Sequence, residues 1–205
     1  MENKTSSNGM SNSEENKQLI HDHAFILNII KIIRDREPAK AAMMIQQIFD
    51  GIYNDMPDTD CANGCSWCCN SRVFITRLEA KAIEAHIRHR FKKDQVDTVV
   101  DRSKKIKKKF QKLTKDERLI AREPCPLLFD GRCSIYSSRP LSCRSTFSTN
   151  SKACEAGDQD PMTNIPIILG PKNMSAEMTA AILMAEGKQE EYELTIPEAI
   201  LKKFK

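Results

Sequence analysis

The chain has 205 residues, of which 32 are basic and 28 are acidic, and it contains 8 cysteines. Glycine and proline together make up about 8% of the residues, which excludes collagen-like and low-complexity linker architectures. The cysteines make up about 4%, less than is typical of a short disulfide scaffold. The chain is long enough for one domain with a hydrophobic core, so the cysteines are not needed to replace a core.

The N-terminal 20 residues are rich in Ser, Asn, Glu and Lys and contain no apolar stretch of the signal-peptide type. The best apolar run, 24–33, is interrupted by Asn28 and Lys31, so no membrane span and no membrane partner are expected. We therefore expect a cytoplasmic protein. In that reducing compartment, clustered cysteines are typical of metal ligands or redox groups rather than of disulfides.

Residues 1–16 are polar and predict a disordered tail, and residues 17–205 predict a single domain. Thr76 and Glu79 form a capping-box pattern, as do Thr114 and Glu117, and each pattern predicts the start of a helix. An extended segment is expected at 72–75. Apolar periodicity and caps predict helices over 17–36, 38–55, 76–91, 94–113 and from 114 onward.

The pattern changes at Pro124. Residues 125–136 predict a tight hairpin, because Asp130-Gly131 supplies the positive φ angles of a two-residue turn. A helical turn is expected at 139–144, a loop-rich stretch at 145–172, and helices at 175–186 and 197–203. The predicted fold is mainly α: a small helical domain in which a cysteine-rich loop and one short β-hairpin form a metal site.

The cysteines carry the main functional signal. Four of them lie within nine residues at 61–69, and a second group follows at Cys125, Cys133 and Cys143. Thiolates two or three residues apart on a loop converge readily on one soft metal, and a hairpin and a following turn can complete the coordination shell. The side chains of adjacent Cys68 and Cys69 diverge in extended backbone, so one of them is expected at a given metal. Cys154 is left open between ligand and bystander.

These residues resemble a known family. The run Cys61-x3-Cys65-x2-Cys68-Cys69 and the later Cys125-Pro-Leu-Leu, Gly131-Arg-Cys133-Ser-Ile-Tyr136 and Arg139-Pro-Leu-Ser-Cys143-Arg144 are similar to the YkgJ-like cysteine-cluster family, a zinc- or iron-chelating domain named for its CxxCxxCC run. The resemblance spans 61–144, with three residues rather than two in the first spacing, and Cys154 matches nothing in it. It implies a metal-binding set of seven cysteines: Cys61, Cys65, Cys68, Cys69, Cys125, Cys133 and Cys143. One branch of this family is linked to methylation of flagellin lysines, and no residue singles out that branch.

The sequence leaves zinc and iron open. A closed site of four cysteines is typical of zinc, whereas seven or eight thiols without a well-placed histidine suit iron–sulfur clusters. We favour an iron–sulfur cluster of the 4Fe-4S type, because a single zinc leaves three or four cysteines without a role. His86 and His89 lie in a charged helical stretch and are expected to be solvated. Redox chemistry or protein modification would be the role of such a centre.

Arg139 and Arg144 flank candidate ligands and are expected in the cofactor's surroundings, where they would donate hydrogen bonds to thiolates or to an anion. A surface ion pair is the alternative for both. Trp67 and Tyr136 lie beside candidate ligands and are expected to shield the site from water or to belong to the core.

Two alternatives of other classes remain. The string C-x3-C-x-aromatic-C around Trp67 resembles the cluster loop of radical S-adenosylmethionine enzymes, which would make Cys61, Cys65 and Cys68 ligands of a four-iron cluster. Residues 88–118 hold 13 Lys/Arg against 5 Asp/Glu, which would let a zinc-stabilised module bind nucleic acid. A solvated helix face explains the same charges. The partner is otherwise unknown, with a protein as one candidate.

Overall fold

The computed structural model describes residues 12–54, 56, 59–61, 64–187 and 194–204, with side chains from residue 23 onward. The elements in chain order are α1 (Asn12–Arg34), α2 (Pro38–Ile52), η1 (Trp67–Asn70), β1 (Phe74–Ile75), α3 (Arg77–Arg90), α4 (Lys93–Gln111), α5 (Lys115–Ile120), β2 (Leu128–Phe129), β3 (Arg132–Cys133), η2 (Tyr136–Ser138), α6 (Leu141–Arg144), α7 (Ser151–Gln159), α8 (Leu169–Ala185), β4 (Leu194–Thr195) and α9 (Ile196–Lys203). The expected mainly helical class is confirmed.

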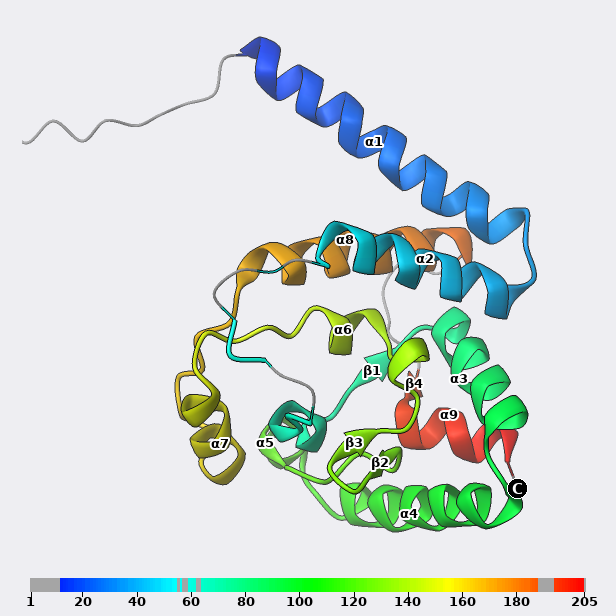
Figure 1. Cartoon of the computed structure of the whole chain (residues 1–205), viewed down its shortest axis with the longest axis vertical. Coiled ribbons are helices and arrows are strands. Elements are labelled where there is room, and N and C mark those ends of the chain that lie inside the picture. The colour runs from blue at the N-terminus through cyan, green and yellow to red at the C-terminus, as the bar shows by residue number, and fades with distance from the viewer. Residues whose placement is uncertain (1–11, 55, 57–58, 62–63, 188–193, 205) are drawn as a thin grey trace, which may run out of the picture.

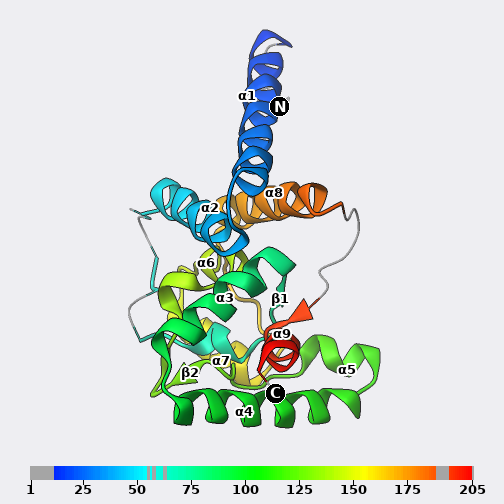
Figure 2. The ribbon, with the colours of Figure 1, turned by 90° about the vertical axis from the view of Figure 1, so that its right-hand side faces the viewer.

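The helices are stacked in layers. Helices α2 and α8 lie above α3 and α6, and α4 lies at the opposite end, below α9 and the β2–β3 hairpin (Figures 1 and 2). Helix α1 packs against α8 and α2 and projects away from the rest of the chain (Figure 1). Residues 1–11 of the expected tail lie outside the described residues. Residues 12–16 of it belong to α1, which begins at Asn12.

Local signals in the sequence locate the middle helices well. The Thr76 side chain accepts a hydrogen bond from Glu79 N, and the Glu79 carboxylate accepts one from Thr76 N, so the predicted capping box opens α3. The same box opens α5 at Thr114, and a third one at Thr195 opens α9. Each box satisfies donors that the first turn of a helix leaves without partners.

The predicted hairpin is confirmed. Phe129 pairs with Arg132, and Asp130 and Gly131 form the turn with φ angles of 49° and 71°. A second antiparallel pair was not predicted: β1 lies beside β4, with Phe74 opposite Thr195. The extended segment expected at 72–75 contains β1, whereas its partner β4 was not predicted. The two strands of that second pair are far apart in sequence, and neither has a turn signal beside it.

The expected loop at 145–172 is wrong, because α7 occupies 151–159 and α8 begins at Leu169. Helix α7 starts at Asn150, whose side chain accepts a hydrogen bond from Ala153 N at 2.9 Å. Because the residues of α7 are mostly small or polar, apolar periodicity gives no signal for this helix. The helix carries Cys154, so this correction bears directly on the cysteines.

The core consists of two clusters that meet on α3. Ile83 and Ile87 pack with residues of α4, α9 and the hairpin, and Leu78 and Ala82 pack with α1, α2, α6 and α8. Cys125 and Cys133 lie at the edge of the first cluster. The core thus fixes the hairpin and the start of α6, which carry the second group of cysteines.

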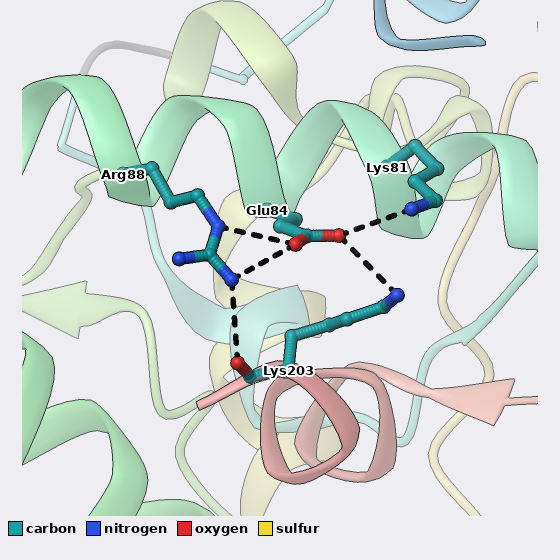
Figure 3. A network of polar contacts seen from close by, with 4 residues as sticks. All are labelled: Lys81, Glu84, Arg88 and Lys203. Carbon is teal, nitrogen blue, oxygen red and sulfur yellow. Dashed lines mark hydrogen bonds and ion pairs between the residues drawn. The ribbon is translucent and has the colours of Figure 1, made fainter. Parts of the chain in front are cut away.

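A network of charged side chains joins α3 to the C-terminal helix α9 (Figure 3). Glu84 accepts from Arg88 Nε at 3.1 Å and pairs with Lys81 and Lys203, each at 3.5 Å. Arg88 also donates to the Lys203 carbonyl at 3.5 Å. The partners of Glu84 are exposed although Glu84 itself is largely covered, and pairs with an exposed partner contribute little each to stability.

The structure bears on both alternative functions. The radical S-adenosylmethionine alternative depends on a βα barrel. The strands of the described residues instead form two separate pairs, and each strand has two residues. The basic segment 88–118 covers α4 and α5, where Lys104, Lys105, Lys107 and Lys108 are exposed and Val99 and Val100 are buried. This is the pattern of a solvated amphipathic helix, and nucleic-acid binding stays a prediction. Within the described residues, no helix has the length and apolar content that crossing a membrane requires.

Candidate metal centre

All the cysteines of the chain face one cavity of about 740 Å³. They come from the segment before η1, from η1, from the hairpin region, from α6 and from α7. The cysteines that line the cavity are Cys61, Cys65, Cys68, Cys69, Cys125, Cys133, Cys143 and Cys154. The structure therefore brings together the seven cysteines that the sequence singled out, and adds Cys154.

Backbone hydrogen bonds join the two cysteine groups directly. Cys125 N donates to the Cys69 carbonyl at 2.9 Å, and Glu123 N donates to the Asn70 carbonyl at 2.8 Å. These bonds hold η1 against the segment that enters the hairpin. Because these are backbone contacts, they hold the two cysteine groups side by side in one wall of the cavity without depending on the side-chain conformations.

The segment after α6 holds the first cysteine. Cys61 Sγ accepts from Ser148 N at 3.3 Å, and Asp60 N donates to the Ser148 carbonyl at 2.9 Å. Further along, Asn70 Nδ2 donates to Asp158 Oδ2 at 2.8 Å, which joins η1 to α7. Helix α7, which the sequence did not predict, thereby places Cys154 beside the first cysteine group.

The thiols share a cavity without forming a coordination shell. Among the described residues, no group of three or more His, Cys, Asp or Glu side chains is close enough to hold a metal ion. Cys61, Cys65 and Cys68 are exposed, while the cysteines of the second group are partly covered. Gly64, in the segment between Cys61 and Cys65, has a φ of 95°, which favours glycine.

Electrostatic neighbours divide the cysteines into two overlapping groups. Burial raises the pKa of Cys65, and the charges of Cys61, Cys68 and Cys154 raise it further. Burial likewise raises the pKa of Cys143, with further increases from the charges of Cys125, Cys68 and Cys133. The pKa of Cys69 is raised first by its hydrogen bond with Cys68, and then by burial and by the charges of Cys68, Cys125 and Cys143. Cys68 thus lies between a group near α7 and a group near the hairpin.

Cys68 and Cys69 differ sharply in acidity. A hydrogen bond from the Cys69 thiol lowers the pKa of Cys68 to about 7. Because Cys69 would lose this bond with its proton, the same contact raises the pKa of Cys69. Burial raises the pKa of Cys125 to about 12 and also raises those of Cys133 and Cys143. The buried thiols therefore remain protonated at neutral pH until something replaces the proton.

This difference predicts selective alkylation of metal-free protein at pH 7. Cys68 should react with iodoacetamide fastest, with a half-maximal rate near pH 7, because the thiolate is the nucleophile. Mass spectrometry of the labelled peptides measures the rates. Cys69→Ala, which removes the hydrogen-bond donor, should shift the midpoint of Cys68 upward. Equal rates for Cys68 and Cys125 would contradict the assignment.

The two arginines have different surroundings. Arg144 is 3% exposed, pairs with Asp50, and donates to the carbonyls of Arg139 and Ser137 at 2.8 and 2.6 Å. Its guanidinium fixes the backbone around α6. Arg139 lies over the Tyr136 ring at 3.8 Å, and its buried Nε has no hydrogen-bond partner among the described residues. Both line the cavity, and Arg139 has the free donor.

Of the two aromatic residues expected to shield the site, Trp67 is half-buried and Tyr136 is 61% exposed, and both line the cavity. His86 departs from the expected solvated position: it is half-buried, and its Nδ1 lies 3.0 Å from Ser138 Oγ. Lys172 on α8 also reaches the cavity and was missed. No spacing signal connects it to the cysteines, since it belongs to a later helix.

A family model named CxxCxxCC, described as "Putative zinc- or iron-chelating domain", matches residues 60–161. This part of the chain belongs to that family. The CxxCxxCC domain covers about half of the chain and includes every cysteine, Cys154 among them. No curated protein and no solved structure matches the chain. The family confirms the resemblance and supports a metal-binding cysteine domain without distinguishing zinc from iron.

Proposed function

We propose that the protein is a cytoplasmic metal-binding protein whose cysteine cavity holds an iron–sulfur cluster, with zinc as the other candidate. The observation that supports it is the convergence of eight thiols on one cavity. Thiolates suit zinc and iron–sulfur clusters, whereas carboxylates and carbonyls suit harder ions. The donor set of this cavity therefore fits the metals for which the CxxCxxCC family is described.

The ligands we propose are the seven cysteines at 61, 65, 68, 69, 125, 133 and 143, together with Cys154. A zinc site or an iron–sulfur cluster takes four thiolates, so eight thiols supply two such centres. The contacts of η1 support this division, because Asn70 joins it to α7, which carries Cys154, and Cys69 joins it to the hairpin region, which carries Cys125. Since the thiols do not form a coordination shell among the described residues, binding must bring the exposed thiols of Cys61, Cys65 and Cys68 closer to the other cysteines.

An iron–sulfur cluster would supply one-electron redox chemistry. The chain's own residues would hold and cover it: the backbone bond between Cys69 and Cys125 fixes the approach of the two cysteine groups, and Trp67 lines the cavity. Arg139, with its free Nε, would donate to a thiolate. We assign the centre a redox or protein-modification role, of which lysine methylation is the type linked to one branch of the family.

Metal analysis tests the proposal. Protein purified without oxygen should be brown and contain stoichiometric iron and acid-labile sulfide, with absorbance that bleaches on reduction. Colourless protein with stoichiometric zinc would replace the cluster with zinc and keep the metal centre. Protein that holds neither metal, and takes up neither after reconstitution under reducing conditions, would contradict the proposed function.

A further inference from the structure

Lys172 brings a positive charge to the cysteine cavity from outside the CxxCxxCC domain. It lies on α8, beyond the matched residues 60–161. Its Nζ donates to the Ser142 carbonyl at 3.3 Å and to Thr146 Oγ1 at 2.7 Å. Because these two acceptors lie on either side of Cys143 in the chain, the ammonium group is held at the part of the cavity wall that carries this thiol.

Among the described residues, no carboxylate forms an ion pair with this cation. Both acceptors of Lys172 are neutral oxygens, and none of the ion pairs found among the described residues includes Lys172 or Arg139. Lys172 is partly buried and lines the cavity together with Arg139. A cation removed from water needs an anion nearby. Asp158 also lines the cavity, but the charged neighbours that raise the pKa of Lys172 are Cys143 and Cys68.

The charge of a thiolate centre matches this need. Four thiolates around a divalent metal leave two negative charges in excess. A low-dielectric cavity screens these charges poorly. Burial lowers the pKa of Lys172, and the nearby charges of Cys143 and Cys68 raise it. The pKa of Cys68 is lowered first by its hydrogen bond from Cys69 and further by the charges of Lys172 and Arg139. The wall therefore presents two cations, neither of which forms an ion pair among the described residues, to the thiols that would carry the excess charge.

We propose that Lys172 is a positioning residue of the cysteine centre: its ammonium group offsets, together with Arg139, the excess negative charge of a thiolate-bound metal. The inference rests on the proposed function, because the thiols gain their negative charge when they bind the metal. It extends the centre beyond the CxxCxxCC domain and gives α8 a part in it.

Three variants of the full chain separate charge from contact. Lys172→Gln keeps a hydrogen-bond donor and removes the charge, and Lys172→Arg keeps the charge. Lys152→Gln is the matched control, since Lys152 is an exposed lysine of α7. Zn²⁺ binding to reduced protein, measured in competition with a colorimetric chelator, gives the affinity of each variant. For protein that carries iron, the reduction potential is a second measurement.

We expect Lys172→Gln to weaken Zn²⁺ binding by roughly 10- to 100-fold, the usual effect of losing a group that supports metal ligands. Lys172→Arg should stay close to wild type, and Lys152→Gln should equal it. In iron-containing protein, Lys172→Gln should lower the reduction potential, because a more negative centre accepts an electron less readily.

Wild-type affinity and potential in Lys172→Gln would overturn the inference and leave the proposed function intact. Equal weakening in the Gln and Arg variants would also overturn it, since contact geometry rather than charge would then matter. Wild-type protein that binds neither Zn²⁺ nor iron would contradict the proposed function, and this inference with it.

Discussion

Replacing Glu79 with alanine should lower the free energy of unfolding by about 3 to 5 kcal/mol. The Glu79 carboxylate is buried and accepts hydrogen bonds from Thr76 N, Thr76 Oγ1 and Leu141 N, at 2.8, 3.0 and 2.8 Å. Its removal leaves three buried donors without partners, and each costs about 1 to 3 kcal/mol. The bond to Leu141 also joins the start of α3 to the start of α6, which carries Cys143. Urea unfolding of metal-free protein measures the loss.

Glu117→Ala is the matched control for this substitution. Glu117 forms the same capping box with Thr114 at the start of α5, but its donors are exposed, and the hydrogen bonds found for it among the described residues all join it to Thr114. Water replaces the lost acceptor there, so the loss of stability should be much smaller. Equal losses in the two variants would show that the box alone accounts for the effect, and that the bond between Glu79 and Leu141 contributes nothing.

Glu79 should also give the unfolding free energy a distinctive pH dependence. Burial raises the pKa of Glu79 above its ordinary value of 4.5, against the opposing effect of its hydrogen bonds. The folded protein then binds this proton more tightly than the unfolded chain, so the contribution of Glu79 to stability falls as pH rises from about 4.5 through the folded pKa. Glu79→Gln should remove this slope, measured as the difference between the two proteins from pH 4 to 7. An identical slope in both would contradict the raised pKa.

The predictable parts of this fold are those that a few neighbouring residues determine. Capping boxes at Thr76 and Thr114 and the Asp130-Gly131 turn depend on contacts within four residues, and the structure confirms all three. The cysteine spacing, likewise local, indicated the candidate centre. Helix ends differ by a few residues, as at 38–55, where α2 ends at Ile52, because tertiary packing decides where the last turn stops.

The features that sequence reasoning missed depend on distant contacts. The extended segment at 72–75 was expected, but its pairing with β4 was not, and α7 packs on η1 through the bond from Asn70 to Asp158. Cys154 seemed isolated for the same reason: its neighbour in space, Cys65, is far away in sequence. Lys172 follows this pattern, since only the packing of α8 on α6 brings its ammonium to the cysteines.

Replacing Cys143 with serine should reduce the affinity for the retained metal by more than about 100-fold, the upper end of what loss of a supporting residue costs. Cys143 lies on α6, in the group of cysteines near the hairpin. Serine is similar in size but cannot supply the thiolate that a soft metal prefers, so the metal of this group is lost while the fold remains. Metal content per chain and the midpoint of a chelator titration measure this.

Two further substitutions make the result specific. Ser142→Ala changes the neighbouring residue of α6, whose buried hydroxyl has no partner among the described residues, and it should bind metal as wild type does. Cys154→Ser removes a thiol from the α7 group alone, so it should lower the metal content by about half if the eight thiols form two four-thiolate centres. Full metal content in Cys143→Ser would exclude this cysteine as a ligand. Complete loss in Cys154→Ser would instead favour one centre that depends on both groups of cysteines.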